Sequence, residues 1–229
     1  MSKPSKRMNA NRESIDSKQH YNLDEAIFLL KKTGNTKFNE TIDIAINLGI
    51  DPKKSDQNLR GSMVLPNGTG KTLRVIVFAQ NEQVDDAKNA GADEVGFEDL
   101  AEKIKSGFSE FDLVIATPDT MRVVGQLGQI LGPKGMMPNP KDGTVTKNVK
   151  DAVIKAKTGQ IRFRNDKGGV VHCSIGKTDF SEESIKQNLE SLLDEIVKSK
   201  PSSSKGSFIK KITVSSTMGP GITIDRNTI

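Results

Sequence analysis

The stretch Leu73-Arg-Val-Ile-Val-Phe78 decides how the middle of this chain of 229 residues folds. It is a short apolar run, and the residues after it alternate between helical patterns and further apolar runs. The sequence predicts helices near 82–90, 98–106 and 119–131, with strands at 94–97 and 111–116 between them. Continuous apolar runs separated by helices are typical of parallel strands that are buried on both faces. We therefore expect the middle of the chain to form a small doubly wound α/β domain of three layers.

The segments on either side of this block show a different pattern. On the amino-terminal side, Asn22 is expected to cap a helix that runs through Lys32, and a strand at 41–48 that alternates apolar and polar residues should follow. On the carboxyl-terminal side, a hairpin over 160–174 is expected to turn at Asp166–Gly168, and a long amphipathic helix begins at Ser181. The two flanks therefore predict one α+β domain of two layers that is split by the inserted block.

The predicted boundaries place residues 1–67 and 159–229 in the split domain and residues 68–158 in the inserted one. The chain then has to cross between the domains twice, at the glycine-containing segments 66–70 and 158–159. Such paired crossings predict a hinge.

Charge is distributed unevenly between these parts. Of 34 Lys and Arg and 29 Asp and Glu, residues 68–159 hold 12 and 13, which leaves 22 basic and 16 acidic residues in the flanks. Within the middle, residues 82–120 hold eleven acids against three lysines, a surface that repels phosphate. If a polyanion binds this protein, we expect it to bind the flanks.

Composition also indicates the compartment. No apolar run approaches the roughly 20 residues that are needed to cross a bilayer, which predicts no membrane association. The basic amino terminus lacks the apolar segment of a secretory signal, and Cys173 is the only cysteine, so no intramolecular disulfide can form. These features predict a cytoplasmic protein.

A phosphate-binding loop is the first alternative function. Residues 67–72 end in Gly-Lys-Thr, but the loop needs a glycine five positions before Gly70, where this chain has Leu65. The segment also leads into a predicted strand instead of a helix. A basic interdomain loop is the better interpretation, and a nucleotide-binding protein is kept as the weaker alternative.

Cofactor and metal chemistry have little support. Residues 79–82, after the first buried strand, lack the glycine fingerprint that a dinucleotide needs. His20, His172 and Cys173 are the only imidazoles and thiol, and the last two are neighbours on a predicted strand, so they point to opposite faces. We expect no enzyme activity, no cofactor and no metal site.

The stretch Thr213–Asp225 favours contact with RNA. A strand pattern there runs into hydroxyls, Met218 and two glycines, Gly219 and Gly221, which lack the Cβ that would hold another backbone away. From these residues alone, an ordinary polar strand with a Gly-Pro turn explains the pattern equally well. The chain has no Trp, one Tyr and nine Phe, so recognition of a structured RNA by its shape is more consistent than stacking of single-stranded bases.

The run Gly125-Gln-Leu-Gly-Gln-Ile-Leu-Gly-Pro-Lys-Gly-Met-Met-Pro-Asn-Pro140 resembles the signature of the ribosomal protein L-one family. Residues 65–71, 162–167 and 217–219 are similar to further motifs of that family and occur in the same order. Together these motifs cover nearly the whole chain. The departures are small, such as Asn67 where bacterial members often have His.

The resemblance implies a fold and a function. It implies a split first domain that binds large-subunit rRNA and a Rossmann-like inserted second domain. It further implies a structural protein of the mobile stalk that assists release of deacylated tRNA from the exit site. The free protein, expected to be a monomer, would repress translation of its own operon mRNA by binding a leader that imitates the rRNA site.

Carried over by position, the family's RNA contacts form two patches on the split domain. The first comprises Lys37, Phe38, Thr41 and Asp43. The second comprises Ser215, Thr217, Met218 and Gly219, with Arg164, Asp166 and Lys167 of the hairpin expected beside them. Burial in a core is the alternative for Phe38 and Met218. On the inserted domain, Lys134, Lys141 and Lys147 either face the departing tRNA or belong to a solvated loop.

Overall fold

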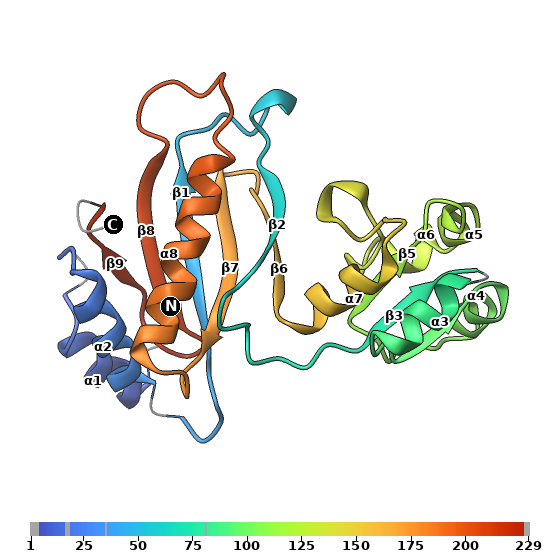
Figure 1. Ribbon diagram of the computed structural model, residues 1–229. Helices are drawn as coiled ribbons and strands as arrows, with labels where there is room; N and C mark the ends of the chain where they lie inside the picture. Colours follow the sequence, from blue (N-terminus) through green and yellow to red (C-terminus); the bar gives the residue numbers. More distant parts are fainter. Residues whose placement is uncertain (1–4, 17–18, 35, 81, 227–229) are drawn as a thin grey trace. The chain divides into compact units, whose positions relative to one another are not determined.

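The computed structural model describes residues 5–16, 19–34, 36–80 and 82–226. The first four residues, which are part of the argument against a secretory signal, lie outside this description. The chain forms two compact units, one made of Met1–Gly70 with Ile161–Ile229 and the other of Lys71–Gln160 (Figure 1). Both units combine helices with strands, so the predicted mixed α/β class is confirmed.

A four-stranded antiparallel sheet is the centre of the split unit. Its strands follow the order β7 (Val170–Lys177), β1 (Thr41–Leu48), β8 (Ile209–Ser216) and β9 (Ile222–Ile224). Helices α2 (Leu23–Thr33) and α8 (Glu182–Lys198) share one core with the apolar side of this sheet, and α8 runs across it in Figure 1. The predicted alternation in β1 is confirmed, because Ile42, Ile44 and Ile46 are buried while Asp43 is exposed.

The predicted hairpin over 160–174 is only partly right. The turn forms, since the Asp166 N–H donates to the carbonyl of Val170, and Asn165 and Val171 form an isolated antiparallel β-bridge. The strands on either side, however, join different sheets: β6 (Gln160–Arg164) pairs with β2 (Arg60–Val64), and β7 pairs with β1. The Phe163 ring lies against Gly61 and adds to the core, which gives β6 an apolar reason to leave β7.

The helix ends in this unit are fixed in different ways. The Ser181 hydroxyl accepts from the Ser184 N–H at the start of α8, as a capping serine should. Asn22 precedes α2 as predicted, but its side chain makes no capping hydrogen bond, so that expectation is wrong. Several elements of this unit have no counterpart in the sequence prediction, among them helix α1 (Lys6–Glu13), the short 3-10 helix η1 (Ser55–Gln57) and strand β2.

The second unit has three layers. Its parallel sheet has the order β4 (Glu94–Gly96), β3 (Val75–Phe78) and β5 (Leu113–Ala116). Helices α3 (Glu82–Asn89) and α7 (Val149–Lys157) share a core with one face, and α4 (Glu98–Lys105), α5 (Met121–Gln126) and α6 (Gly128–Leu131) share a core with the other. The 3-10 helix η2 (Pro140–Asp142) lies in the loop before α7.

One predicted helix of this unit is wrong in its extent. Residues 119–131 form two short helices that meet at Leu127. Gly125 and Gly128 flank this break, and glycine weakens a helix interior.

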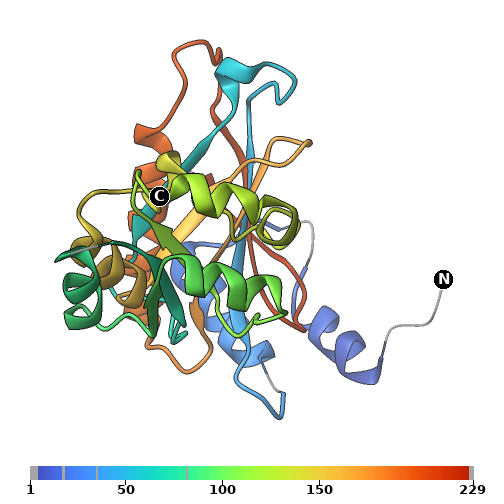
Figure 2. The same ribbon diagram turned by 90° about the vertical axis from the view of Figure 1, so that its right-hand side faces the viewer.

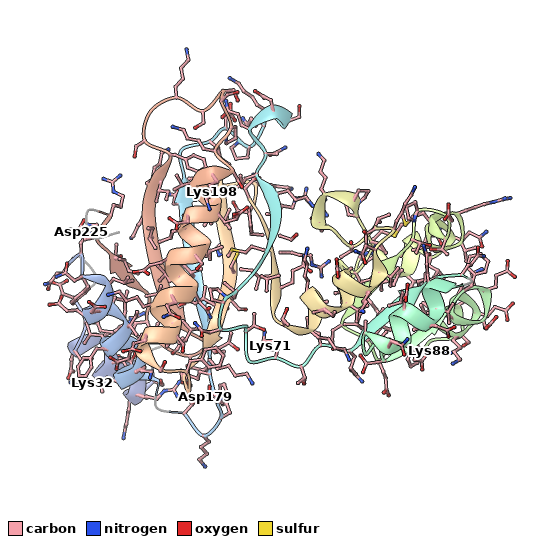
Figure 3. The ribbon with its side chains drawn as sticks, viewed as in Figure 1. Lys32, Lys71, Lys88, Asp179, Lys198 and Asp225 are labelled. Atoms are coloured by element: carbon pink, nitrogen blue, oxygen red, sulfur yellow. The ribbon has the colours of Figure 1, made fainter. Side chains whose placement is uncertain are left out.

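The first crossing between the units is held firmly to the split unit. Asn188 on α8 is fully buried; its Oδ1 accepts from the Asn67 N–H, and its Nδ2 donates to the carbonyls of Gly68 and Ile175. Regular structure resumes only at β3, and Figure 3 labels Lys71 on the intervening segment. This segment enters a strand and opens no helix, in agreement with the argument against a phosphate-binding loop. None of the helices in the described ranges is both long and apolar enough to cross a membrane.

Candidate nucleic-acid interface

The face of the four-stranded sheet opposite its core carries short polar side chains, and we call it the open face. The strand register arranges them in three rows. In the first row Asp43 lies between Ser174 and Ser215; in the second, Ala45 lies between His172 and Thr213; in the third, Asn47 lies between Val170 and Lys211. These side chains are exposed or half-buried. Paired residues of an antiparallel sheet point to the same side, so each row is a line of neighbours.

The small residues of this face leave a shallow hollow of about 360 Å³. Ala45, Ser174 and Ser215 line it, with the Asp43 carboxylate and the His172 ring at its sides. Carboxylate and hydroxyl oxygens are acceptors, and a hydroxyl also donates. The hollow can therefore receive a group that both donates and accepts hydrogen bonds.

One end of the open face is closed by the Thr217–Gly219 turn. The Thr217 hydroxyl accepts from the Thr41 N–H at 3.0 Å and lies 3.3 Å from the Thr41 carbonyl, to which the Thr217 N–H also donates. The Met218 N–H donates to the Glu40 carboxylate at 2.9 Å. The structure thus brings Thr41 and Thr217 together, as expected, but uses the Thr217 hydroxyl within the protein.

Glu40 is a buried carboxylate beneath this turn, with only 1% of its surface exposed. Burial alone would raise its pKa. The Ser216 hydroxyl, the Met218 N–H, the Thr36 hydroxyl and the positive charge of Arg7 together outweigh burial, so the pKa of Glu40 is lowered. The turn is therefore fixed on an ionised carboxylate.

Gly219 packs closely against its own turn. A Cβ at this position would lie 2.5 Å from the Ser216 Oγ, which is closer than atoms can pack. From the sequence, we attributed the absence of a Cβ at Gly219 to the close approach of RNA. Packing against Ser216 within the turn is a second reason for a glycine at this position.

Large apolar side chains are exposed beside this turn. Phe38 is 53% exposed and Met218 is 48% exposed, so neither belongs to the core and that alternative is wrong. Lys37 is exposed next to Phe38, and Thr41 and Asp43 share the open face as predicted. A flat ring, a thioether and an ammonium group are thus available to a partner at the same end.

The hairpin residues do not lie beside Ser215–Gly219, so that expectation is wrong. Val170 pairs with Asn47 and the Leu48 N–H donates to Gly169, which places the turn at the far end of β1 from Thr41. Six strand residues separate the two ends, about 20 Å. The open face lies between them, so the candidates form one elongated surface with Arg164, Asp166 and Lys167 at its second end.

Asp166 shapes this second end. Its Oδ1 accepts from the N–H groups of Gly168 and Val170, both at 2.8 Å, and its Oδ2 lies 3.8 Å from the His172 Nε2. The bond from Val170 is the main cause of a lowered pKa at Asp166, with Gly168 and His172 adding to it. Asp166 therefore orders the turn, while Arg164 and Lys167 are exposed and available to a partner.

The inserted unit carries the other three candidates. Lys134, Lys141 and Lys147 are exposed in the segment between α6 and α7. The Asn139 side chain accepts from the Lys141 N–H, and the Thr144 hydroxyl accepts from the Asn139 N–H, so the middle of this loop is ordered.

Sequence reasoning missed four residues of this surface. His172 and Lys211 lie on the open face, and the alternation of their strands could have revealed them. Glu40 and Arg7 reach the turn only through the fold, because Arg7 donates to the Met218 carbonyl across 211 residues of sequence. The prediction that His172 and Cys173 point to opposite faces of β7 is confirmed, since His172 is exposed while Cys173 is buried. Burial raises the pKa of the Cys173 thiol to about 12.

The comparisons with known proteins agree with one another. A model of the ribosomal protein L1p/L10e family matches residues 30–220. The chain is 58% identical over 229 residues to the large ribosomal subunit protein uL1 of Mannheimia succiniciproducens, across the whole of both chains. It is 58% identical over 229 residues to uL1 of Vibrio vulnificus, covering all of this chain and 98% of that one. To uL1 of Tolumonas auensis it is 59% identical over 226 residues, covering 99% of this chain and 97% of that one. The chain is thus a member of the ribosomal protein L1p/L10e family.

Proposed function

We propose that this chain is a structural, non-enzymatic component of the large ribosomal subunit that binds 23S-type rRNA at the mobile stalk. The RNA lies along the open face and meets the Thr217–Gly219 turn at one end and the Asp166 turn at the other. In the same proposal the protein is cytoplasmic and is a monomer when it is free of the ribosome.

A single observation carries this proposal: the open face has a hollow lined by hydroxyls and a carboxylate, and Phe38 and Met218 are exposed at one end of that face. A ribose 2′-OH both donates and accepts, and so suits the hollow, where Asp43 accepts from it and Ser215 does either. Phe38 offers a face for stacking of an unpaired base. Lys37, Arg164, Lys167 and Lys211 supply the positive charge for phosphates along the same surface.

We propose two further roles, each resting on its own group of residues. The exposed lysines 134, 141 and 147 of the inserted unit favour contact with the tRNA that leaves the exit site. The leader of the protein's own operon mRNA is proposed to use the open face, so that excess free protein represses its translation. The two roles differ in the competition they predict: the leader should displace rRNA from the open face, whereas tRNA should not.

The test is rRNA affinity measured by filter binding, with two hydroxyl variants as a matched pair. Ser215→Ala should weaken binding and leave thermal unfolding unchanged, because its hydroxyl faces the hollow. Thr217→Val should also lower the melting temperature, since its hydroxyl is bonded to Thr41. Lost hydrogen bonds of this kind cost about 0.5–1.5 kcal/mol each. If the double variant Asp43→Ala/Ser215→Ala binds rRNA with the affinity of the wild type, the open face is not part of the interface.

A further inference from the structure

Helix α1 has little in its own chain to stabilise it. None of its eight residues is buried, and they show no apolar face, since the only large apolar residue is Met8. Isolated helices of this length are marginal in water, and a helix that is polar all round gains nothing from a core. Burial of an apolar face therefore does not account for this helix.

The fold nevertheless fixes the position of α1. Asn11 donates to the Thr33 carbonyl at the end of α2 at 3.2 Å, and Ile15, just after the helix, is buried in the core. The Asp16 N–H donates to the Tyr21 hydroxyl at 2.9 Å. Figure 2 shows α1, in dark blue, at the outer edge of its unit. The second half of the helix is therefore anchored to its unit.

The first turn of α1 touches the candidate interface. The Arg7 guanidinium lies 3.5 Å from the Met218 carbonyl, and its charge also acts on the buried Glu40. Arg7 is half-buried by these contacts, whereas Lys6 and Arg12 are exposed. The helix has three basic residues and one acidic residue, Glu13. A basic, exposed helix therefore continues directly from the turn that closes the open face.

We propose that α1 is a phosphate-binding arm of the RNA interface, along which the RNA strand leaves the Thr217–Gly219 turn. This inference rests on the proposed function. Two features favour RNA as the occupant: α1 is continuous with the candidate interface, and its charge is complementary to a phosphate backbone. Arg7 holds the helix against Met218, and Lys6 and Arg12 meet phosphates. The arm positions the RNA without reading its sequence, because phosphate contacts carry no base information.

The experiment measures rRNA affinity of the full chain at several salt concentrations. The variant Lys6→Gln/Arg12→Gln removes two exposed charges and spares Arg7, so the turn stays intact. Its matched control is Lys88→Gln/Lys155→Gln, which removes two exposed charges of the inserted unit. The arm predicts severalfold weaker binding and a slope of log affinity against log salt that is shallower by about 0.9 for each lost contact. The control should keep the wild-type slope, and Lys6→Arg/Arg12→Lys should restore binding.

Each outcome separates the inference from the proposed function. Failure of the wild-type chain to bind rRNA would sink the proposed function itself. If the wild-type chain binds and Lys6→Gln/Arg12→Gln matches it in affinity and slope, only the arm is wrong. Tighter binding by that variant would show that α1 shields the turn, which also overturns the arm. Melting temperatures equal to that of the wild type exclude misfolding as the cause.

Discussion

At the scale of single residues, the turn at 217–219 fits together through contacts that no spacing in the sequence reveals. Gly219 packs against Ser216, and Met218 is bonded through its N–H to Glu40. A glycine beside a proposed RNA contact is therefore not by itself evidence for that contact. The close packing against Ser216 also explains why this position has no Cβ. Substitutions here have to separate the stability of the turn from its contact with RNA.

We expect Gly219→Ala to destabilise the protein by about 1–3 kcal/mol, the usual cost of overpacking. The added Cβ meets the Ser216 Oγ at 2.5 Å. In Ser216→Ala/Gly219→Ala that oxygen is gone, so the melting temperature should return to that of Ser216→Ala alone. If the double variant still binds rRNA poorly, the added methyl group meets RNA. Equal melting temperatures for Gly219→Ala and wild type would contradict the packing argument.

Asp166 gives a pH-dependent prediction. Its pKa is lowered in the folded protein, so its contribution to stability is complete above the unfolded value of about 3.9 and is lost as pH falls through the folded value. The stability difference between wild type and Asp166→Asn should shrink as the pH falls below about 4. Urea unfolding over a pH series measures it. A difference that does not shrink below about pH 4 would contradict the assigned hydrogen bonds.

At the scale of elements, Asn188 joins three segments that are far apart in sequence. It holds Asn67 and Gly68 of the first crossing to α8 and β7, and the Arg74 N–H donates to Asp112, so we expect a hinge at this crossing to lie between Gly68 and Arg74. Asn188→Leu keeps the branched shape of the side chain but removes the partners of one N–H and two carbonyls. Such groups cost about 1–3 kcal/mol each when they are buried.

The corresponding measurement is urea unfolding together with hydrogen exchange at the Asn67 amide. We expect Asn188→Leu to lower the free energy of unfolding and to speed exchange at that amide. Gln187→Ala, which removes only an exposed contact to the Asn67 side chain, is the control and should change little. Unchanged exchange in Asn188→Leu would mean that the crossing is held by other contacts.

Periodicity predicted those elements whose burial follows a regular pattern. Strand β1 and the buried strand β5 are examples, because alternation or a continuous apolar run shows which faces are covered. Pairing partners were not predictable: β6 leaves its neighbour β7 for β2, and only the fit of Phe163 against Gly61 shows why. Helix α1 was missed because it has no apolar period. For the candidate site, strand spacing placed Thr41 and Asp43, whereas the distance between the two turns depended on the register.

At the scale of the whole molecule, the two units have separate cores, and all proposed rRNA contacts lie in the split one. A chain that joins residues 1–70 to 161–229 through a short Gly linker should fold and keep most of the rRNA affinity. The isolated residues 71–160 should bind weakly, because the acids at 82–120 oppose phosphate. Filter binding of both chains is the test. Comparable affinity in the isolated unit would move the interface to it.

The pairing of β1 with strands from the far end of the chain also has a consequence during synthesis on the ribosome. Strand β1 is synthesised early, but its partners β7 and β8 begin at Val170 and Ile209. More than half of the chain therefore has to be synthesised before β1 can pair with either strand. The inserted unit is continuous in sequence, and its core can close in the meantime. The nascent protein thus passes through a stage in which one unit is folded and the sheet edges of β1 are unpaired, a period of exposure to chaperones and to aggregation. RNA-binding activity should then appear abruptly, only after β8 has left the exit tunnel.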